Sequence, residues 1–304
     1  MKKIFLNIYL QGGLGNQLFQ FILGYIIAKK NKVQLRLNIE RYNSYNRQFE
    51  LDKFPEIHKL NISKIKNYNL FFNIYLYIHA KFCKLLKIFN LYNFINYFFP
   101  MNTEIFEESP YIYNEDLLKK KIDKNITITG YFQSEKYFTS YRKHVLKLFR
   151  FPKIKDELIM SFLYLIKNNN SVAVHIRRGD YLSNPKARYF HGILGQDYYK
   201  KSITYIRKKL KKPSFFIFSD DIHLVKKTFP FFNNKNYTFI NTNSAMNDLY
   251  LMKNCKHFII ANSTFSWWGA WLSTNKSKII CSPKKWSRSK SAQTDIIPKS
   301  WIRI

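Results

Sequence analysis

The stretch Ser171-Val-Ala-Val-His-Ile-Arg-Arg-Gly-Asp-Tyr181 decides the fold class of this 304-residue chain. Its uninterrupted apolar run predicts a strand buried on both faces, as in the parallel sheets of α/β proteins. Ligands of open α/β sheets bind beyond the carboxyl ends of the strands, and two arginines, a glycine and an aspartate follow that end here. The segment therefore predicts an anion site at a strand end.

The two arginines of this stretch are predicted to have different partners. Successive side chains of a strand point to opposite faces, so only one of Arg177 and Arg178 faces the ligand crevice if the strand geometry continues. The other needs a partner elsewhere, and Asp180 is the nearest candidate. For the motif taken by itself, an ion pair that only fastens the strand end remains the alternative.

Strands and helices are predicted to alternate along most of the chain. The N-terminal part starts with an apolar strand, a glycine-rich turn and an apolar-rich helix, and Phe151-Pro152 marks a crossing into a second alternating series. Such alternation predicts parallel, doubly wound sheets, and the chain length fits two domains, residues 1–150 and 151–304. The predicted strands cover 4–10, 33–39, 126–131, 171–176, 214–219, 237–240, 257–261 and 278–281, and the predicted helices cover 17–29, 196–210, 221–228, 247–252 and a stretch from 266.

Basic residues greatly outnumber acidic ones. The chain has 51 Lys and Arg against 19 Asp and Glu, a formal net charge of +32, which raises nucleic acid or an anionic membrane as a partner. The lysines are, however, spread along the chain among Asn, Ile, Phe and Tyr, as AT-rich coding also produces. Because no zinc finger, RRM signature or clustered basic helix occurs, no nucleic-acid partner is predicted.

Cysteine usage and apolar segments bear on the compartment. Cys83, Cys255 and Cys281 are widely spaced, which argues against a disulfide framework or a cysteine metal site and favours the cytoplasm. No segment has the ~18 apolar residues of a membrane span, and the apolar start of the chain is interpreted as a strand rather than a signal peptide. The aromatic segment from Tyr68 to Pro100 carries lysines, so it allows peripheral contact with an anionic inner membrane, although core packing is the commoner role.

A glycine-rich turn, Gln11-Gly-Gly-Leu-Gly-Asn-Gln17, separates the first predicted strand from the first helix. Gly13 and Gly15 let the backbone approach a ligand there, and a helix N-terminus favours negative charge. The spacing differs from the dinucleotide fingerprint, and no P-loop lysine follows. A tight turn in which Asn16 caps the helix is the alternative.

The segment Phe218-Ser-Asp-Asp221 also joins a predicted strand to a helix. One interpretation is that an aspartate caps the helix. The other is that the two acids hold a divalent ion on a nucleotide diphosphate, for which a single adjacent pair is weak evidence because hard ions take several oxygen ligands.

A second anion site is predicted in Asn262-Ser-Thr-Phe-Ser-Trp-Trp-Gly-Ala-Trp271, again between a strand and a helix. Ser263, Thr264 and Ser266 offer hydroxyls beside the free N–H groups of the helix start. The three tryptophans are predicted to pack in the core. With Arg177 on the same crevice, this combination suits a nucleotide diphosphate held by amides, hydroxyls and arginine without a metal.

The chain resembles the α-1,2-fucosyltransferases of glycosyltransferase family eleven over nearly its whole length. The motifs that carry the resemblance are Gly12-Gly-Leu-Gly-Asn-Gln17, Gly130-Tyr-Phe-Gln133, His175-Ile-Arg-Arg-Gly-Asp180, Phe218-Ser-Asp-Asp221 and Asn262-Ser-Thr-Phe-Ser-Trp-Trp-Gly-Ala270. The resemblance implies an α/β fold of two facing Rossmann-like domains (GT-B type), with the acceptor on the N-terminal and GDP-fucose on the C-terminal domain. It also implies metal-independent, inverting transfer of L-fucose from GDP-β-L-fucose to the 2-hydroxyl of a galactose-terminated cell-surface glycan such as lipopolysaccharide or capsule.

The resemblance also implies roles for individual residues. Arg177 is expected at the β-phosphate. Because a fixed guanidinium stabilises the charge that grows on the leaving GDP, we expect Arg177 to be the principal catalytic residue. Asn16 is a candidate to position the acceptor hydroxyl or a donor oxygen. The remaining donor-binding residues it implies are His175 and Asp248 near the guanine, together with Gly13, Gly15, Arg178, Asp180, Ser263, Thr264, Phe265 and Ser266. No general base is identified, because the candidates Glu40, Glu50, Asp52 and Glu135 are more often surface or structural groups. A non-catalytic carbohydrate- or nucleotide-sugar-binding protein is the alternative, but it does not need a phosphate-gripping arginine pair.

Overall fold

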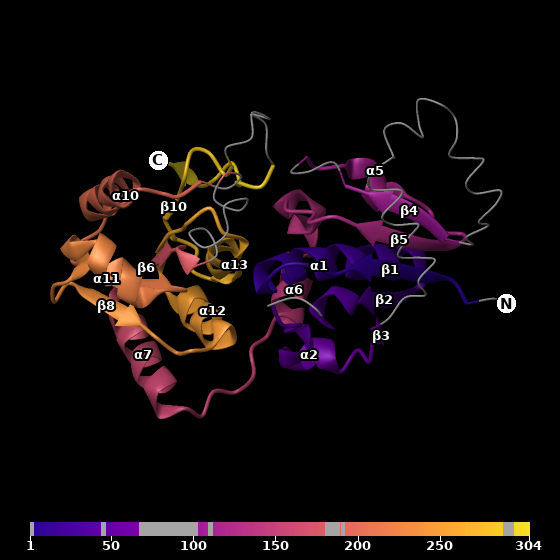
Figure 1. Ribbon diagram of the computed structural model, residues 1–304, viewed down its shortest axis with the longest axis horizontal. Helices are drawn as coiled ribbons and strands as arrows, with labels where there is room; N and C mark the ends of the chain where they lie inside the picture. Colours follow the sequence, from indigo (N-terminus) through magenta and orange to yellow (C-terminus); the bar gives the residue numbers. More distant parts are fainter. Residues whose placement is uncertain are drawn as a thin grey trace.

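The computed structural model describes residues 3–43, 47–66, 103–108, 112–179, 189, 192–287 and 295–304. Its strands form two separate sheets, one from each half of the chain, with helices packed around and between them (Figure 1). All the strand pairs described are parallel. The predicted α/β class is confirmed.

The first sheet has five strands in the order β3-β2-β1-β5-β4. Parallel neighbours need a crossover, and helix α1 supplies it between the first two strands. The elements of this half are β1 (Phe5–Tyr9), α1 (Leu14–Asn31), β2 (Gln34–Asn38), α2 (Pro55–His58), β3 (Ser63–Ile65), β4 (Thr103–Glu107), α5 (Glu115–Lys119), β5 (Asn125–Thr129) and α6 (Arg142–Leu148), with short 3-10 turns at 40–43, 51–53, 135–137 and 139–141.

The second sheet has six strands in the order β11-β10-β9-β6-β7-β8. Its central strand β6 is the apolar run at 170–176, and it is buried on both faces because helices cover the sheet on each side. The elements are α7 (Glu157–Asn168), β6 (Asn170–Ile176), α10 (Gln196–Lys209), β7 (Pro213–Ser219), α11 (Ile222–Thr228), a 3-10 turn at 230–232, β8 (Tyr237–Ile240), α12 (Ala245–Asn254), β9 (His257–Ile259), α13 (Thr264–Leu272), β10 (Ile280–Ser282) and β11 (Ile302–Arg303).

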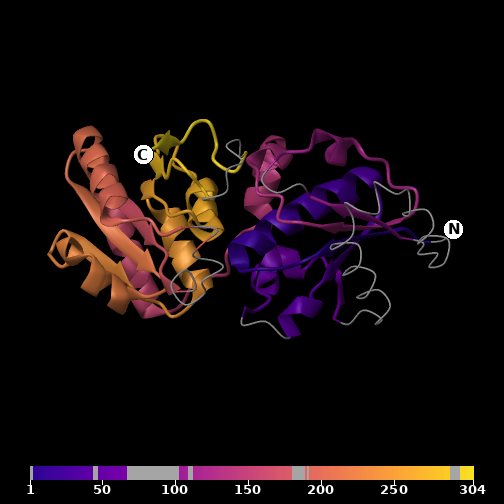
Figure 2. The same cartoon turned by 45° about the horizontal axis from the view of Figure 1, so that its top comes forward.

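Helices α1 and α13 lie side by side where the two halves meet (Figure 2). An aromatic cluster between them joins the halves. The ring of Phe19 on α1 lies 4.6 Å from Trp267 and 4.9 Å from Trp268, centroid to centroid. Phe138 stacks on Trp268 at 5.2 Å. Both tryptophans are fully buried, and Trp271 is nearly so, so the prediction that they are packing residues is confirmed.

Several element boundaries differ from those predicted. Helix α1 begins at Leu14 rather than at residue 17, and α13 begins at Thr264 rather than at 266. The chain crosses from one half to the other between α6 and α7, and the domain boundary at residue 150 stays a prediction. Within the described residues, no helix combines the length and apolar character needed to cross a membrane. The predicted membrane segment from Tyr68 to Pro100 lies outside the described residues.

Candidate active site

Arg177 follows the carboxyl end of β6 and forms an ion pair with Asp220, which follows the adjacent strand β7. The Arg177 Nη1 to Asp220 Oδ2 distance is 3.2 Å, and both side chains are largely shielded from solvent. The same carboxylate accepts hydrogen bonds from the backbone N–H groups of Arg178 (2.8 Å) and Gly179 (2.9 Å). Asp220 therefore holds both the guanidinium and the backbone at the strand end, where an anion site was predicted.

Arg178 points away from this pair. Its guanidinium donates to the carbonyl oxygens of Arg177 (3.0 Å) and Leu194 (2.9 Å) and lies 4.6 Å from the centroid of the Phe229 ring. The side chain is 5% exposed, and burial lowers its pKa. The prediction that the two arginines diverge is confirmed. The guanidinium of Arg178 is buried and does not join that of Arg177 in the predicted anion site. Its expected partner Asp180 lies outside the described residues.

His175 lies in β6, two residues before Arg177. It is almost fully buried, and its ring is 5.6 Å from that of Phe265. Burial, with a smaller contribution from the Arg177 charge, lowers the pKa of His175 to about 3, so the imidazole is neutral at physiological pH. Its Nδ1 has no hydrogen-bond partner in the described part of the protein. A neutral buried ring with an unused nitrogen is suited to bind a polar ligand edge.

The start of α13 covers this face of the second sheet. Ser263 precedes the helix as its cap residue, and its side chain makes no capping bond. Thr264 and Phe265 are partly exposed in the first turn. The prediction that the Ser266 hydroxyl faces a ligand is wrong. Ser266 is fully buried, and its hydroxyl donates to the carbonyl oxygen of Ser263 at 3.2 Å. Ser263 is 8% exposed, so the predicted phosphate cradle has one partly exposed hydroxyl, that of Thr264, beside the largely buried hydroxyl of Ser263.

The glycine turn of the first half meets α13 directly. A Cβ atom on Gly15 would lie 2.5 Å from the carbonyl carbon of Thr264 and 2.7 Å from the backbone nitrogen of Phe265. Only glycine permits this approach, which brings the N-termini of α1 and α13 together. Three predicted site segments therefore converge: Gly12–Gln17, His175–Gly179 and Asn262–Ser266.

Asn16 lies in the first turn of α1, and the interpretation that it caps the helix is wrong. Gly13 is the cap residue, and the Asn16 backbone N–H donates to its carbonyl oxygen at 2.9 Å. The Asn16 Oδ1 instead accepts a hydrogen bond of 2.9 Å from Gln133 Nε2, which belongs to the Gly130-Tyr-Phe-Gln133 motif. Gln133 is buried, so it holds the Asn16 amide in place.

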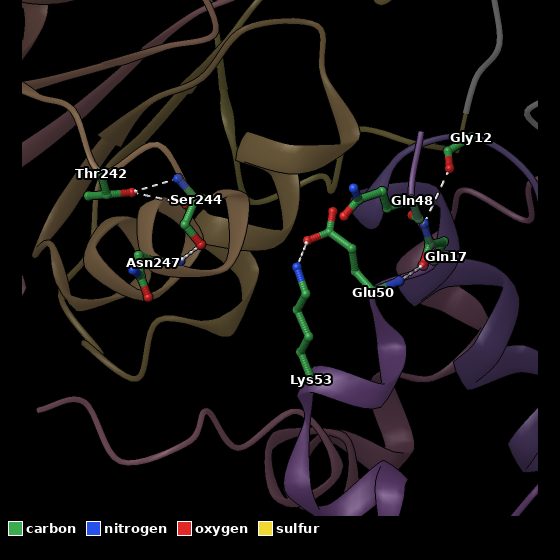
Figure 3. A network of polar contacts seen from close by, with 8 residues as sticks. All are labelled: Gly12, Gln17, Gln48, Glu50, Lys53, Thr242, Ser244 and Asn247. Carbon is green, nitrogen blue, oxygen red and sulfur yellow. Dashed lines mark hydrogen bonds and ion pairs between the residues drawn. The ribbon is translucent and has the colours of Figure 1, made fainter. Parts of the chain in front are cut away.

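Gln17, fully buried in α1, fastens the glycine turn to residues 48–50 (Figure 3). Its Nε2 donates to the carbonyl oxygens of Gln48 (2.8 Å) and Gly12 (3.3 Å), and its Oε1 accepts from the Glu50 backbone N–H (2.9 Å). The buried amide thus satisfies the irregular backbone around the turn. Sequence reasoning missed this role, although a glutamine at the start of an apolar helix was a signal.

Asp248 lies in the first turn of α12, after the Ser244 cap. Its Oδ1 accepts a hydrogen bond of 2.7 Å from the Thr242 hydroxyl. Burial raises the pKa of Asp248 to about 6, against the smaller effect of that hydrogen bond. The carboxyl is a candidate to bind a ligand N–H group, and its role at the guanine stays a prediction.

The adjacent acids after β7 have separate partners. Asp221 caps α11 by accepting a hydrogen bond of 2.9 Å from the Leu224 backbone N–H, which confirms the capping interpretation. Asp220 is engaged by Arg177 and two backbone amides, as described above. Among the described residues, no three or more His, Cys, Asp or Glu side chains gather as metal ligands would.

The four carboxylates considered as general bases are Glu40, Glu50, Asp52 and Glu135, and contacts with protein groups are described for the last three. Glu50 is 2.9 Å from Lys53 Nζ, and Asp52 forms an ion pair with Lys64. Glu135 accepts a hydrogen bond of 3.0 Å from the Trp271 indole, and burial raises its pKa. The fourth, Glu40, opens the 3-10 turn at 40–43. None of these contacts identifies a general base.

The two α/β halves, each built on a parallel sheet, have the GT-B type of fold. The family model for glycosyl transferase family 11 matches residues 5–304. The chain therefore belongs to glycosyl transferase family 11.

Relatives agree with this assignment, and a solved structure shares the fold. An O-antigen biosynthesis glycosyltransferase, WbnK, and an α-1,2-colitosyltransferase, both of Escherichia coli, are each 33% identical to this chain; the alignments cover 97% of this chain and 99% and 97% of the relatives. A galactoside 2-α-L-fucosyltransferase of Mus musculus is 27% identical over 48% of this chain and 42% of its own. Arabidopsis thaliana FUT1, solved as a variant with GDP, has the same fold at 12% identity, with a TM-score of 0.50 over 99% of this chain and 76% of that one.

Proposed function

We propose that this glycosyltransferase moves L-fucose from GDP-β-L-fucose to the 2-hydroxyl of a galactoside, with inversion at the anomeric carbon. The observation that supports the proposal most is the meeting of the glycine turn, the start of α13 and the end of β6, since Gly15 touches Thr264 and Phe265 touches His175. The geometry offers backbone N–H groups, hydroxyls and a guanidinium together, as a sugar diphosphate requires.

Arg177 is proposed to stabilise the leaving GDP. Negative charge grows on the β-phosphate as the sugar–phosphate bond breaks, and a fixed cation in a shielded site stabilises that charge without reorganisation. Asp220 fixes the guanidinium from the side of β7. Asn16, held by Gln133, is proposed to position the acceptor hydroxyl or a donor oxygen.

Donor binding is proposed for the residues around this pair. We propose that His175 and Asp248 bind the guanine, and that Ser263, Thr264 and the backbone of Phe265 bind the diphosphate. Gly13 is proposed to leave room for the donor at the start of α1, because a Cβ atom there would meet no atom within 4 Å. Gly15 instead packs against the backbone of α13, so it is not proposed to contact the donor. Arg178 is proposed to hold the backbone of Arg177 in place, through its hydrogen bond to the Arg177 carbonyl oxygen.

The sugar is the finer point to be tested, because a relative at 33% identity is named for colitose. Purified protein is incubated with a β-galactoside acceptor and either GDP-L-fucose or GDP-colitose, and the product linkage is determined by NMR. The proposal expects an α-1,2-linked fucoside formed faster than the colitoside. Faster colitosyl transfer would reassign the donor, and donor binding without transfer to a range of galactosides would favour a non-catalytic nucleotide-sugar-binding protein.

We also propose that transfer needs no metal ion. Asp220 and Asp221, the acids that a diphosphate-bound cation would use, are already engaged by Arg177, backbone amides and the start of α11. Activity is therefore expected to persist in EDTA. A strict requirement for added Mg²⁺ or Mn²⁺ would contradict this.

The biological setting is proposed from the relatives. One of them is named for O-antigen biosynthesis, which favours a lipopolysaccharide or capsule glycan as the acceptor. A cytoplasmic location, with peripheral contact at the inner membrane, is part of the proposal. The first half of the chain is proposed to receive the acceptor and the second half the GDP-sugar.

A further inference from the structure

Glu108, directly after β4, is a partly buried carboxylate that binds the turn following β5. Its Oε2 accepts hydrogen bonds from the backbone N–H groups of Tyr131 (2.6 Å) and Phe132 (2.7 Å). Burial raises the pKa of Glu108 to about 7, against the opposing effect of these two donors. The two backbone N–H groups therefore need a hydrogen-bond-accepting oxygen at this shielded position, and Glu108 supplies it.

The turn that Glu108 binds has an unfavourable backbone. Gly130 has φ +148° and Phe132 has φ +51°, a left-handed conformation that non-glycine residues rarely adopt. A Cβ atom on Gly130 would lie 2.4 Å from the Cβ of Glu108. The turn is wrapped closely around the glutamate side chain, and a strained conformation of this kind persists only when its surroundings fix it.

The same turn leads directly to Asn16. Gln133 follows Phe132 and donates its hydrogen bond of 2.9 Å to Asn16 Oδ1. From the other side, Gln20 on α1 donates to the Gly130 carbonyl oxygen at 2.9 Å. The contacts therefore run in series from the Glu108 carboxylate through the turn to the side-chain amide of Asn16.

We propose that Glu108 is a positioning residue, which fixes the Gly130–Gln133 turn through its acceptor oxygen and thereby sets the orientation of the Asn16 amide during transfer. This inference rests on the proposed function, in which Asn16 positions a reacting group. The carboxylate acts by accepting two N–H bonds and takes no proton from the substrate. An uncharged acceptor of the same length should then replace it.

Glu108→Gln and Glu108→Ala separate these roles. The glutamine amide oxygen still accepts from the turn, so Glu108→Gln should keep kcat within about threefold of the parent. Glu108→Ala leaves two buried N–H groups unpaired, and kcat should fall at least tenfold while KM for the GDP-sugar changes less than threefold. Equal losses in both variants would point to proton transfer and overturn the proposal, as would full activity of Glu108→Ala.

A double-mutant cycle tests whether the effect passes through Asn16. If it does, Glu108→Ala in an Asn16→Ala background should cost less than twofold further activity. If the double variant instead loses activity by the product of the two single losses, the proposal is contradicted. Should Glu108→Ala fail to fold, Gln133→Met keeps the carboxylate and its two bonds and removes only the contact with Asn16; it should lower kcat to the same extent, and unchanged activity would overturn the proposal.

An NMR measurement keeps this test separate from the proposed function. The side-chain amide resonance of ¹⁵N-labelled Asn16 should shift in Glu108→Ala and stay in place in the control Glu115→Ala, whose carboxylate makes an exposed pair with Lys119. An unmoved Asn16 resonance in Glu108→Ala overturns the positioning role even if no transfer is detected. Absence of transfer by the parent protein, in contrast, counts against the proposed function alone.

Discussion

Arg177 carries the mechanism at the scale of single residues, because the guanidinium offers paired donors in a fixed plane. Arg177→Lys and Arg177→Ala should both abolish transfer with little loss of stability, since an ammonium does not reproduce those paired contacts. The measurement is kcat/KM beside a urea unfolding curve, with exposed Arg150→Lys as the matched control. A lysine variant within about tenfold of the parent, roughly 1.4 kcal/mol of barrier, would show that Arg177 is not at the leaving phosphate.

His175 should make the protein less stable in acid. Its pKa is lowered to about 3 in the folded state from an ordinary value near 6.5, so the unfolded state binds the extra proton between these values. The stability that this group contributes is present above about pH 6.5 and is lost as the pH falls toward 3. His175→Gln, which cannot titrate, should show a smaller drop in urea midpoint between pH 7 and pH 5 than the parent. Parallel drops would contradict the assigned pKa.

The side to which successive side chains point was predictable from the sequence, whereas contacts between residues distant in the sequence were not. Arg177 and Arg178 follow the end of β6, and their divergence agrees with the alternation expected if the strand geometry continues beyond Ile176. Asp220, which holds Arg177, comes from the next strand, and the positive φ of Phe132 is set by Glu108 and the surrounding packing. Burial of the Ser266 hydroxyl likewise follows from how α13 packs, which its sequence does not reveal.

At the scale of elements, the contact between the N-termini of α1 and α13 should be intolerant of added volume. Alanine usually stabilises a helix position relative to glycine by up to about 1 kcal/mol. Gly15→Ala should do the opposite and cost about 1–3 kcal/mol of unfolding free energy, because the added Cβ meets backbone atoms of Thr264 and Phe265 that cannot move aside easily.

The control for this contact is Gly195→Ala at the start of α10. A Cβ atom there has no neighbour within 4 Å, so urea unfolding should show little change. Equal stability of the Gly15→Ala and Gly195→Ala variants would mean that the two helix starts do not pack as described.

Long apolar elements were predictable, and short polar strands were not. The central strand β6 and helix α1 follow from their apolar runs, although both ends of α1 differ from those predicted. Strands β3, β4 and β11 escaped prediction because runs of two to five residues with polar side chains do not show a strand pattern; their place at or near sheet edges comes from pairing.

At the scale of the whole molecule, the charge of +32 favours an anionic surface over a second copy of the same chain. The described residues present four large apolar side chains on α7 that are 41–69% exposed: Leu158, Met160, Tyr164 and Leu165. Exposed lysines flank them at 153, 155 and 167. This combination is typical of helices that rest on an anionic bilayer.

The protein should therefore co-sediment weakly with vesicles that contain anionic lipid at low salt, since each basic residue near the surface adds about 1 kcal/mol. High salt should release it because the attraction is screened. Tyr164→Ser with Leu165→Ser should reduce pelleting, while Ser161→Ala on the same helix serves as control. No pelleting at low salt eliminates the membrane contact, and binding that survives high salt would mean that apolar insertion dominates.

The most direct test of the account is a crystal structure of the protein with GDP. The account predicts that the β-phosphate lies against the Arg177 guanidinium and the start of α13, with the guanine near His175 and Asp248. A diphosphate bound away from Arg177, or held at the acids after β7 through a metal ion, would contradict it.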